Sequence, residues 1–140
     1  MLKKFPDQIL FTKSTPVADI KEGIEIAEYL KQEIRSLTWG RCAGLAAPQI
    51  GINKRVFIAL DIVYINPEIL SASPLKKKFK EGCYSLIKDA VYDVERPMSI
   101  KVKYISNTNK IKEVFLVGLN AQVFQHEFDH LEGRLCSGNN

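Results

Sequence analysis

The sequence has 140 residues, of which 46% are apolar and 26% are charged, and its formal net charge is +4. These values are ordinary for a soluble globular protein and predict a single domain over residues 1–140. No apolar run approaches the roughly 18 residues of a membrane span, so we expect no membrane partner. The densest basic run, Lys76-Lys77-Lys78, lacks interleaved aromatic residues, which indicates a solvated loop or strand edge rather than a nucleic-acid motif.

The chain contains three cysteines, Cys42, Cys83 and Cys136. An odd number, in a sequence whose first residues do not form a signal peptide, argues against a disulfide framework. The sequence therefore predicts a reducing compartment, namely the cytoplasm.

The first predicted helix follows an irregular segment that extends through Thr15. Ser14 and Thr15 are candidate N-terminal caps, and Pro16 suits a first helical turn. Apolar residues then recur every three or four positions, with charged residues between them, until Gly40 ends the helix. These residues are Ile20, Ile24, Ala27, Leu30, Ile34 and Leu37. The stripe predicts a scaffold helix that faces the core.

Small residues dominate the next segment, residues 42–51, so another backbone or a ligand can approach it closely. Pro48 is incompatible with a central strand, and the Gln49 side-chain amide can donate a hydrogen bond to an oxyanion. Composition alone favours a tightly packed turn here.

Strands are expected over residues 55–60 and 62–70, which are rich in Val, Ile, Phe and Tyr. Asn66-Pro67 interrupts the second of them, so that strand bends or lies at an edge. A third strand is expected over residues 75–86, and it carries the run Glu81-Gly82-Cys83-Tyr84-Ser85.

Residues 97–105 alternate, which places Met98, Ile100, Val102 and Tyr104 on one face of a strand. Residues 107–109 form a turn, residues 111–117 return as the hairpin partner, and a helix over residues 119–132 ends at Gly133. These elements predict an α+β fold, with antiparallel sheets packed around the C-terminal helix and one N-terminal helix.

The last predicted helix carries both histidines of the chain, in the run Gln125-His126-Glu127-Phe128-Asp129-His130. Positions i and i+4 share one helix face, so the two imidazoles can bind one ion while Glu127 acts on a water held by that ion. The alternative is a solvated helix face with two unrelated histidines.

A mononuclear metal site would need a third ligand from elsewhere in the chain. Cys83 is the best candidate, because glycine and polar residues surround it; the alternative is a small core residue. Cys42 and Cys136 are weaker candidates.

Three segments together resemble the peptide deformylase family. Gly44-Leu45-Ala46-Ala47-Pro48-Gln49 is similar to the family's G-x-G-L-A-A-P-Q motif, Glu81-Gly82-Cys83-Tyr84-Ser85 to E-G-C-L-S, and the histidine run at residues 125–130 to Q-H-E-x-D-H. Each motif is short, but the three in this order are highly specific, and the resemblance covers nearly the whole chain.

The resemblance implies that Cys83, His126 and His130 bind one divalent metal ion, with water in the fourth position. Fe²⁺ is the native metal in many members, and Zn²⁺, Ni²⁺ or Co²⁺ can replace it. The implied reaction is hydrolysis of the N-formyl group from the initiator methionine of new polypeptides, which releases formate. N-formylmethionyl peptides are therefore the expected substrates.

The resemblance also implies roles for residues around the metal. Glu127 accepts a proton from the metal-activated water and passes it to the departing amine. The Gln49 side chain and the backbone N–H of Tyr84 donate to the carbonyl oxygen as charge builds there. Gly44 lies where the family pairs its backbone with the substrate.

Leu119 and Val123 are expected to line an apolar pocket for methionine. Gln122 shares their helix face and is polar where an apolar wall would be expected. Glu81 and Arg96 are interpreted in two ways: as a pair that supports the Cys83 segment, or as two surface charges.

The sequence departs from the family pattern in four places, one of which is the missing proline after the second motif, at Leu86-Ile87-Lys88. Cys42 stands where the first glycine of G-x-G is expected, and Tyr84 replaces the leucine after the ligand cysteine. The chain also stops ten residues after His130, where many members continue into a helix associated with ribosome docking. We therefore expect at most weak ribosome association and a compact form such as those that phages encode. Two other functions stay open: an amidase or peptidase acting on a different acyl group, and a catalytically silent homologue.

Overall fold

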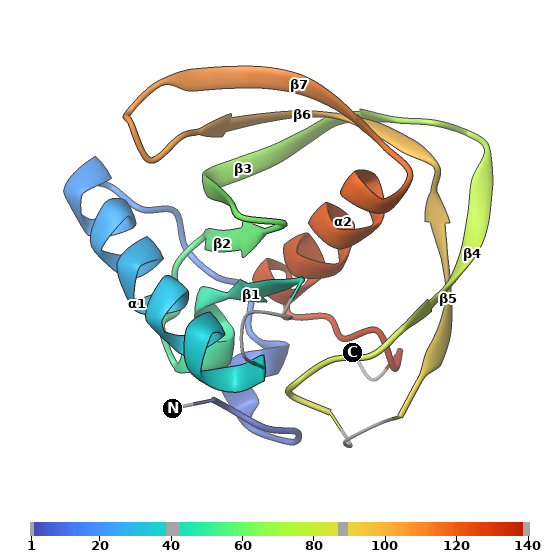
Figure 1. The fold of residues 1–140 in the computed structure, drawn as a ribbon, viewed down its shortest axis with the longest axis horizontal. Helices are drawn as coiled ribbons and strands as arrows, with labels where there is room; N and C mark the ends of the chain where they lie inside the picture. Colours follow the sequence, from blue (N-terminus) through green and yellow to red (C-terminus); the bar gives the residue numbers. More distant parts are fainter. Residues whose placement is uncertain (1, 39–42, 87–89, 139–140) are drawn as a thin grey trace.

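The structure is a computed structural model, and it describes residues 2–38, 43–86 and 90–138. Gly40 and Cys42 lie outside the described residues. The elements are, in chain order, the 3₁₀ helix η1 (Gln8–Phe11), α1 (Ile20–Thr38), β1 (Gly44–Ala46), the 3₁₀ helix η2 (Ala47–Ile50), β2 (Val56–Ala59), β3 (Ile62–Ala72), β4 (Lys76–Glu81), β5 (Tyr92–Pro97), β6 (Ser99–Ile105), β7 (Ile111–Val117) and α2 (Leu119–Leu131). Two helices with antiparallel sheets confirm the predicted α+β class (Figure 1).

The strands form two antiparallel sheets. The larger has the order β1-β2-β3-β6-β7, and the smaller contains β4 and β5. Figure 1 shows α2 between the five-stranded sheet and the β4–β5 pair. This position lets α2 contact residues from both sheets. None of the helices in the described ranges is long and apolar enough to cross a membrane.

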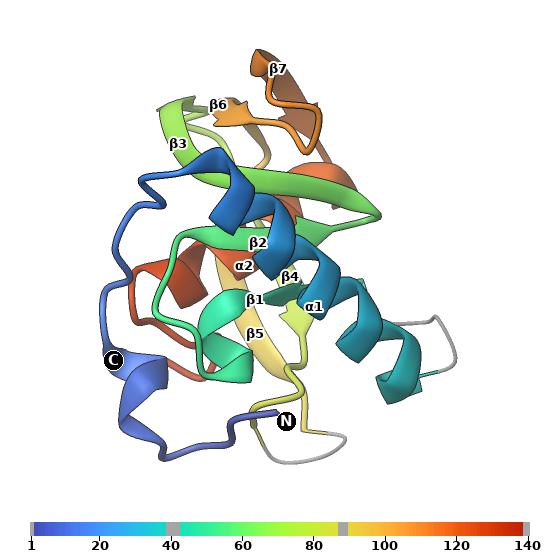
Figure 2. The same ribbon diagram turned by 90° about the vertical axis from the view of Figure 1, so that its left-hand side faces the viewer.

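Strand β2 is buried along its whole length because the two helices cover its opposite faces (Figure 2). Phe57 belongs to the hydrophobic cluster that includes Phe124 of α2, whereas Ile58 belongs to the cluster that includes Leu30 of α1. Successive strand residues point to opposite faces, so two apolar neighbours serve two separate cores.

The N-terminus of α1 differs from the prediction. The helix begins at Ile20, four residues after Pro16, and Asp19 caps it by accepting a hydrogen bond from the Lys21 N–H at 2.9 Å. Thr15 instead forms a bridge to Lys54. The expected stripe does face the core: Ala27 and Leu30 are buried, and the other four predicted residues pack against them.

Ser14 was also expected to cap α1, but it supports the other helix. Its hydroxyl donates to the Leu131 carbonyl at the C-terminal end of α2 (2.9 Å). Arg55 donates to the same carbonyl and pairs with Glu132 at 2.6 Å. Gly133 follows with φ 77°, as predicted for a residue that ends a helix. These contacts fix the end of α2 that carries His130.

Three strand boundaries differ from the prediction. The 42–51 segment contains the short strand β1 before the 3₁₀ helix that holds Pro48. The third expected strand ends at Glu81, so Cys83 lies in the loop after β4, where the Leu86 N–H bonds back to the Cys83 carbonyl. Met98 is 38% exposed because the chain turns a corner there between β5, which was not predicted, and β6.

The other strand predictions are confirmed. Asn66 has φ 49°, and the register between β3 and β6 shifts next to it, so the strand bends as expected. Strands β6 and β7 form the predicted hairpin, and Ile100, Val102 and Tyr104 are buried on one face.

Candidate metal centre

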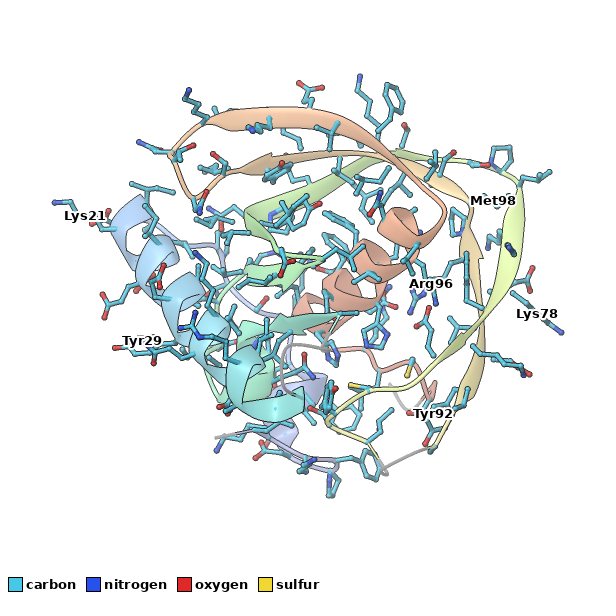
Figure 3. The ribbon with its side chains drawn as sticks, viewed as in Figure 1. Lys21, Tyr29, Lys78, Tyr92, Arg96 and Met98 are labelled. Carbon is cyan, nitrogen blue, oxygen red and sulfur yellow. The ribbon has the colours of Figure 1, made fainter. Side chains whose placement is uncertain are left out.

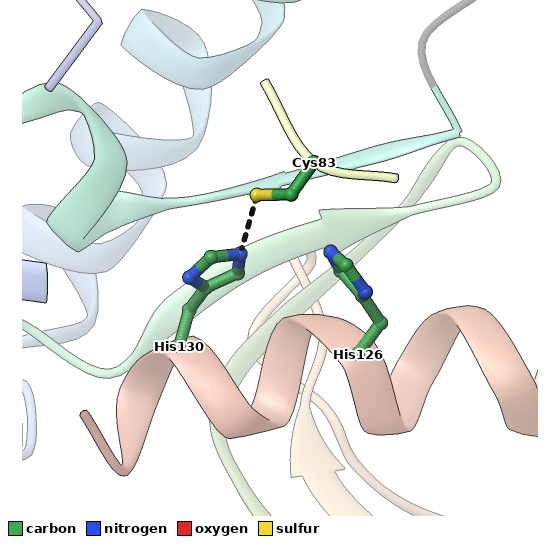
Figure 4. Close-up of side chains that lie close together, drawn as sticks. All are labelled: Cys83, His126 and His130. Carbon is green, nitrogen blue, oxygen red and sulfur yellow. Dashed lines mark hydrogen bonds between the residues drawn. The ribbon is translucent and has the colours of Figure 1, made fainter. Parts of the chain in front are cut away.

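Helix α2 presents His126 and His130 on one face, with ring centroids 5.3 Å apart. Figure 4 shows both imidazoles extending from α2 toward Cys83. The Cys83 Sγ lies 3.4 Å from His130 Nε2, and ligand atoms of all three residues lie within 4.8 Å of one another. The structure therefore brings together the three predicted ligands, although Cys83 precedes the two histidines by 43 and 47 positions in the sequence. One thiolate and two imidazoles form a donor set suited to zinc and to first-row transition metals.

His126 is oriented by a carboxylate behind it. Its Nδ1 donates to Glu81 Oε1 at 2.8 Å, which leaves Nε2 as the nitrogen available to an ion. Burial disfavours the imidazolium, but hydrogen bonds with Cys83 and Glu81 prevail and raise the pKa of His126 to about 10. Surroundings that stabilise a positive charge on this ring would stabilise a bound cation in the same way.

Glu81 and Arg96 form a buried ion pair, so the interpretation as two surface charges is wrong. Arg96 Nε and Nη2 donate to the two Glu81 oxygens at 2.6 and 2.8 Å, and Nη1 donates to Asp129 of α2 at 2.9 Å. Figure 3 labels Arg96 between β5 and α2. Burial opposes the Glu81 charge, yet hydrogen bonds from Arg96 and His126 lower the pKa of this carboxyl to about 2. Arg96 therefore ties β4, β5 and α2 together beside the candidate ligands.

His130 is the most deeply buried of the three candidate ligands, at 1% exposure. Burial, followed by the nearby positive charges of His126 and Arg96, lowers the pKa of His130 well below its usual value. The ring is consequently neutral at neutral pH, which is the form that binds metals. Its Nδ1 is buried without a hydrogen-bond partner among the described residues.

Glu127 points into the same space from α2. Its Oε1 is buried without a partner in the described part of the chain, and burial is the main reason that its pKa rises to about 7. A carboxyl with that pKa can both accept and release a proton at neutral pH. A Cβ on Gly44 would lie 2.7 Å from the Ile58 carbonyl oxygen and 2.8 Å from Glu127 Oε2, so glycine is needed here because the Ile58 backbone is close, and its small size also leaves room for the carboxylate.

The Gln49 side chain is held at both ends. Its Oε1 accepts from the Ala46 N–H at 2.9 Å, and its Nε2 donates to Ser85 Oγ at 3.2 Å. The same nitrogen lies 3.6 Å from Cys83 Sγ. The amide is thus fixed beside the candidate ligands and directs its N–H groups toward them.

A pocket of about 210 Å³ opens onto this cluster. Its lining includes every residue predicted for catalysis or substrate binding, and two of the three candidate ligands: Gly44, Gln49, Cys83, Tyr84, Leu119, Val123, His126 and Glu127. His130 is the exception and lies behind the pocket wall. A substrate in the pocket would therefore meet the candidate base, the amide and the ligand cluster together.

Cys136, the weaker candidate, lies behind His126. Its Sγ groups within 4.8 Å with ligand atoms of Glu81 and His126. However, Glu81 is already occupied by Arg96, and burial raises the pKa of Cys136 to about 12, so this residue is a neutral thiol at neutral pH. Metals bind the thiolate form, so the burial of Cys136 opposes its use as a ligand.

Two residues of the cluster had no role in the sequence analysis. Asp129 holds Arg96, and Ser85 holds Gln49. Both belong to the motif segments on which the resemblance is based, and this membership could have indicated that they have a role at the site. Their partners, Arg96 in β5 and Gln49 in η2, are distant in the sequence and could not be identified from spacing.

Comparison with known proteins gives a consistent result. A family model described as "Polypeptide deformylase" matches residues 1–139. The peptide deformylase of Thermotoga maritima is 37% identical over 139 residues, which cover 96% of this chain and 82% of that protein.

Solved structures agree with this match. A probable peptide deformylase from Synechococcus phage S-SSM7 has a TM-score of 0.87 and 38% identity, covering 98% of this chain and 97% of that one. An actinonin-bound class I type b peptide deformylase from Acinetobacter baumannii has a TM-score of 0.87 and 32% identity, covering 97% of this chain and 94% of that one.

Proposed function

The chain belongs to the polypeptide deformylase family, and on that premise we propose how its residues carry out the reaction. The protein is a hydrolase that removes the N-formyl group from nascent peptides. We propose that residues 1–140 form one catalytic domain, and that the preferred substrate is a polypeptide with a formylated initiator methionine.

We assign Cys83, His126 and His130 as the ligands of a single divalent metal ion. The grouping of their ligand atoms within 4.8 Å is the observation that carries this assignment. The family is metal-dependent. We propose Fe²⁺ as the resident metal, with Zn²⁺, Ni²⁺ or Co²⁺ able to substitute, because thiolate and imidazole donors suit all four. When bound, the ion supplies Lewis-acid chemistry, which polarises a carbonyl oxygen and acidifies water.

Glu127 is proposed as the general base and acid. Its buried Oε1 has no hydrogen-bond partner among the residues that the structure describes, and a water in the pocket can donate to it. Because its pKa is raised to about 7, the carboxylate can take a proton from the attacking water and return it to the departing amine.

The Gln49 amide and the Tyr84 backbone N–H are proposed as donors to the formyl oxygen as negative charge develops. Ser85 and Ala46 hold the Gln49 amide in one orientation, so only the N–H that faces Cys83 Sγ has to change its acceptor during the reaction. Removing one donor of this kind typically raises the barrier by about 2.7–4 kcal/mol.

Substrate binding is assigned to other residues of the pocket lining. Leu119 and Val123 of α2 line the pocket and are proposed to contact the methionine side chain. Gly44 in the edge strand β1 is proposed to pair its backbone with the peptide, which would extend the sheet by one strand.

The setting of the reaction is proposed from the same family membership. Nascent formylated chains appear at the ribosome, so we place the protein in the bacterial cytoplasm, or in an infected cell if a phage encodes it. Any ribosome association is proposed to be weak and electrostatic, in line with the mild net charge of +4.

The deciding experiment measures formate release from formyl-Met-Ala-Ser by protein prepared anaerobically and loaded with Fe²⁺. The wild-type protein should turn over, and Glu127→Ala should lose nearly all activity while keeping its metal. No turnover by wild-type protein with a full metal complement would refute the proposal. Equal turnover of the acetylated peptide would instead indicate a broader amidase.

A further inference from the structure

Gln122 interrupts the apolar wall of the substrate pocket. Gln122 and Val123 of α2 lie three and four positions after Leu119 and four and three positions before His126, so the four residues share one helix face, and all four line the pocket. Leu119 and Val123 are apolar, so Gln122 is the residue that brings a polar group to this part of the wall.

The orientation of that amide is determined by its neighbour. Gln122 Nε2 donates to Glu81 Oε2 at 3.3 Å. Both Glu81 oxygens accept hydrogen bonds from Arg96, so the carboxylate presents acceptors to Gln122; the NH₂ end of the amide therefore faces it and the carbonyl end faces away. Within the described residues, no other hydrogen bond is made by this side chain. One N–H and the carbonyl oxygen therefore remain available to a ligand.

We propose that Gln122 is a specificity-determining residue that makes this pocket accept a first side chain with a polar end, of which methionine sulfoxide is the test case. The inference rests on the proposed function, because it assumes that the first side chain of a formylated peptide enters this pocket. The spare N–H of Gln122 donates to the sulfoxide oxygen, while Leu119 and Val123 contact the methylene groups.

The physical reason is the cost of burying a polar atom. A sulfoxide oxygen that enters a fully apolar pocket loses its hydrogen bonds to water, which typically lowers binding about 10- to 100-fold. A donor in the wall removes most of that penalty. Norleucine has no hydrogen-bond acceptor, so it should bind with a smaller advantage over methionine sulfoxide in this pocket than in a fully apolar one.

The test uses three peptides that differ only near one atom: formyl-norleucine-Ala-Ser, formyl-Met-Ala-Ser and formyl-Met-sulfoxide-Ala-Ser. The measured quantity is kcat/KM for each, obtained from formate release by metal-loaded protein. For the wild type, we expect the sulfoxide peptide to fall within about tenfold of the norleucine peptide. In Gln122→Met, which has nearly the same volume and no donor, the sulfoxide-to-norleucine ratio should drop at least about tenfold.

Leu119→Met is the matched control, because it reshapes the same wall and removes no polar group; it should leave the ratio unchanged. Metal content is measured for every variant, since Gln122 also contacts Glu81. A uniform loss on all three peptides together with lost metal would mean that Gln122 acts only through Glu81, and would overturn the proposal.

A wild-type ratio below about one-hundredth would overturn it as well, without reliance on any variant. Inactivity on formyl-Met-Ala-Ser would instead refute the deformylase function itself, so the two failures are distinguishable.

Discussion

The two halves of the candidate metal centre are held in place by different forces. The α2 half carries His126, Glu127 and His130. Hydrogen bonds from Ser14 and Arg55 hold the C-terminal end of this helix, and aromatic packing holds its middle. Phe124 is fully buried, with ring centroids 5.0 Å from Phe57 and 4.9 Å from Tyr64. The Cys83 half is a loop after β4, and buried polar contacts hold its surroundings: Arg96 with Glu81, and Gln49 with Ser85.

This contrast separates stability from ligand geometry. Apolar packing is strong and non-directional, so it suits a helix whose internal spacing already orients its side chains. A loop lacks the regular backbone geometry of a helix, so directional hydrogen bonds must define where the Cys83 thiol lies. We therefore expect changes in the α2 packing to affect mainly unfolding, and changes in the polar network to affect mainly the metal and the chemistry.

The largest expected effect is on stability, from Phe124→Ala. Removing a fully buried aromatic ring should lower the free energy of unfolding by about 3–5 kcal/mol. Metal affinity should stay unchanged at temperatures where the variant remains folded. Urea denaturation and metal titration measure the two quantities. Phe115→Ala is the control: this ring is 74% exposed, and its loss should change stability by no more than about 0.5 kcal/mol. Equal effects of the two variants would contradict the role given to the aromatic core.

The next effect is on metal affinity, from Glu81→Gln. The substitution preserves the shape of the side chain but removes the negative charge that faces His126 and Arg96. Loss of such a supporting partner typically weakens metal binding about 10- to 100-fold. Metal retained after dialysis against a chelator measures the change. Glu113→Gln removes a carboxylate from an exposed pair with Lys101 and should retain the metal as the wild type does. Unchanged retention by Glu81→Gln would show that the network does not position the ligand.

The same division explains what could be predicted from the sequence. Helix α2 and its histidines followed from local spacing, because i and i+4 residues share a face wherever the helix packs. The hairpin of β6 and β7 followed from alternation and a turn. Cys83 was selected from its polar, glycine-containing surroundings and by resemblance, since nothing local requires a thiol after Gly82 to approach two histidines more than forty residues away.

The parts that were missed depend on tertiary contacts. Asp19 rather than Ser14 caps α1 because Ser14 is drawn to the Leu131 carbonyl, a partner 117 positions away. Strand β5 has charged residues on its exposed face and lacks a continuous apolar pattern, so periodicity gave no signal for it. Its importance comes from Arg96, whose two carboxylate partners lie on β4 and α2.

A smaller effect is expected on turnover, from Ser85→Ala. The hydroxyl accepts from Gln49 Nε2, and a neutral hydrogen bond contributes about 0.5–1.5 kcal/mol, which corresponds to roughly a two- to tenfold lower kcat. KM should change less than kcat, because the amide is proposed to act on the developing oxyanion. Ser36→Ala, on the exposed face of α1, serves as the control. A wild-type kcat in Ser85→Ala would mean that the Ala46 contact alone orients Gln49.

The smallest effect at neutral pH is expected from Tyr64→Phe, which tests a polar atom inside the aromatic half. Burial, with a lesser contribution from Tyr104, raises the pKa of Tyr64 to about 12, whereas an unfolded tyrosine titrates near pH 10. The fold thus favours the neutral phenol: this stabilisation is complete below pH 10 and is lost as the pH rises toward 12. The urea concentration at the unfolding midpoint of the wild type should therefore decrease as the pH rises from 10 to 12, and that of Tyr64→Phe should decrease less.

Tyr104→Phe should change the alkaline profile in the same direction, since burial also raises the pKa of Tyr104. Parallel profiles for the wild type and both variants would mean that the phenols stay hydrated in the folded protein. In that case the aromatic half would contain water at its centre, and the separation between an apolar helix half and a polar loop half would have to be abandoned.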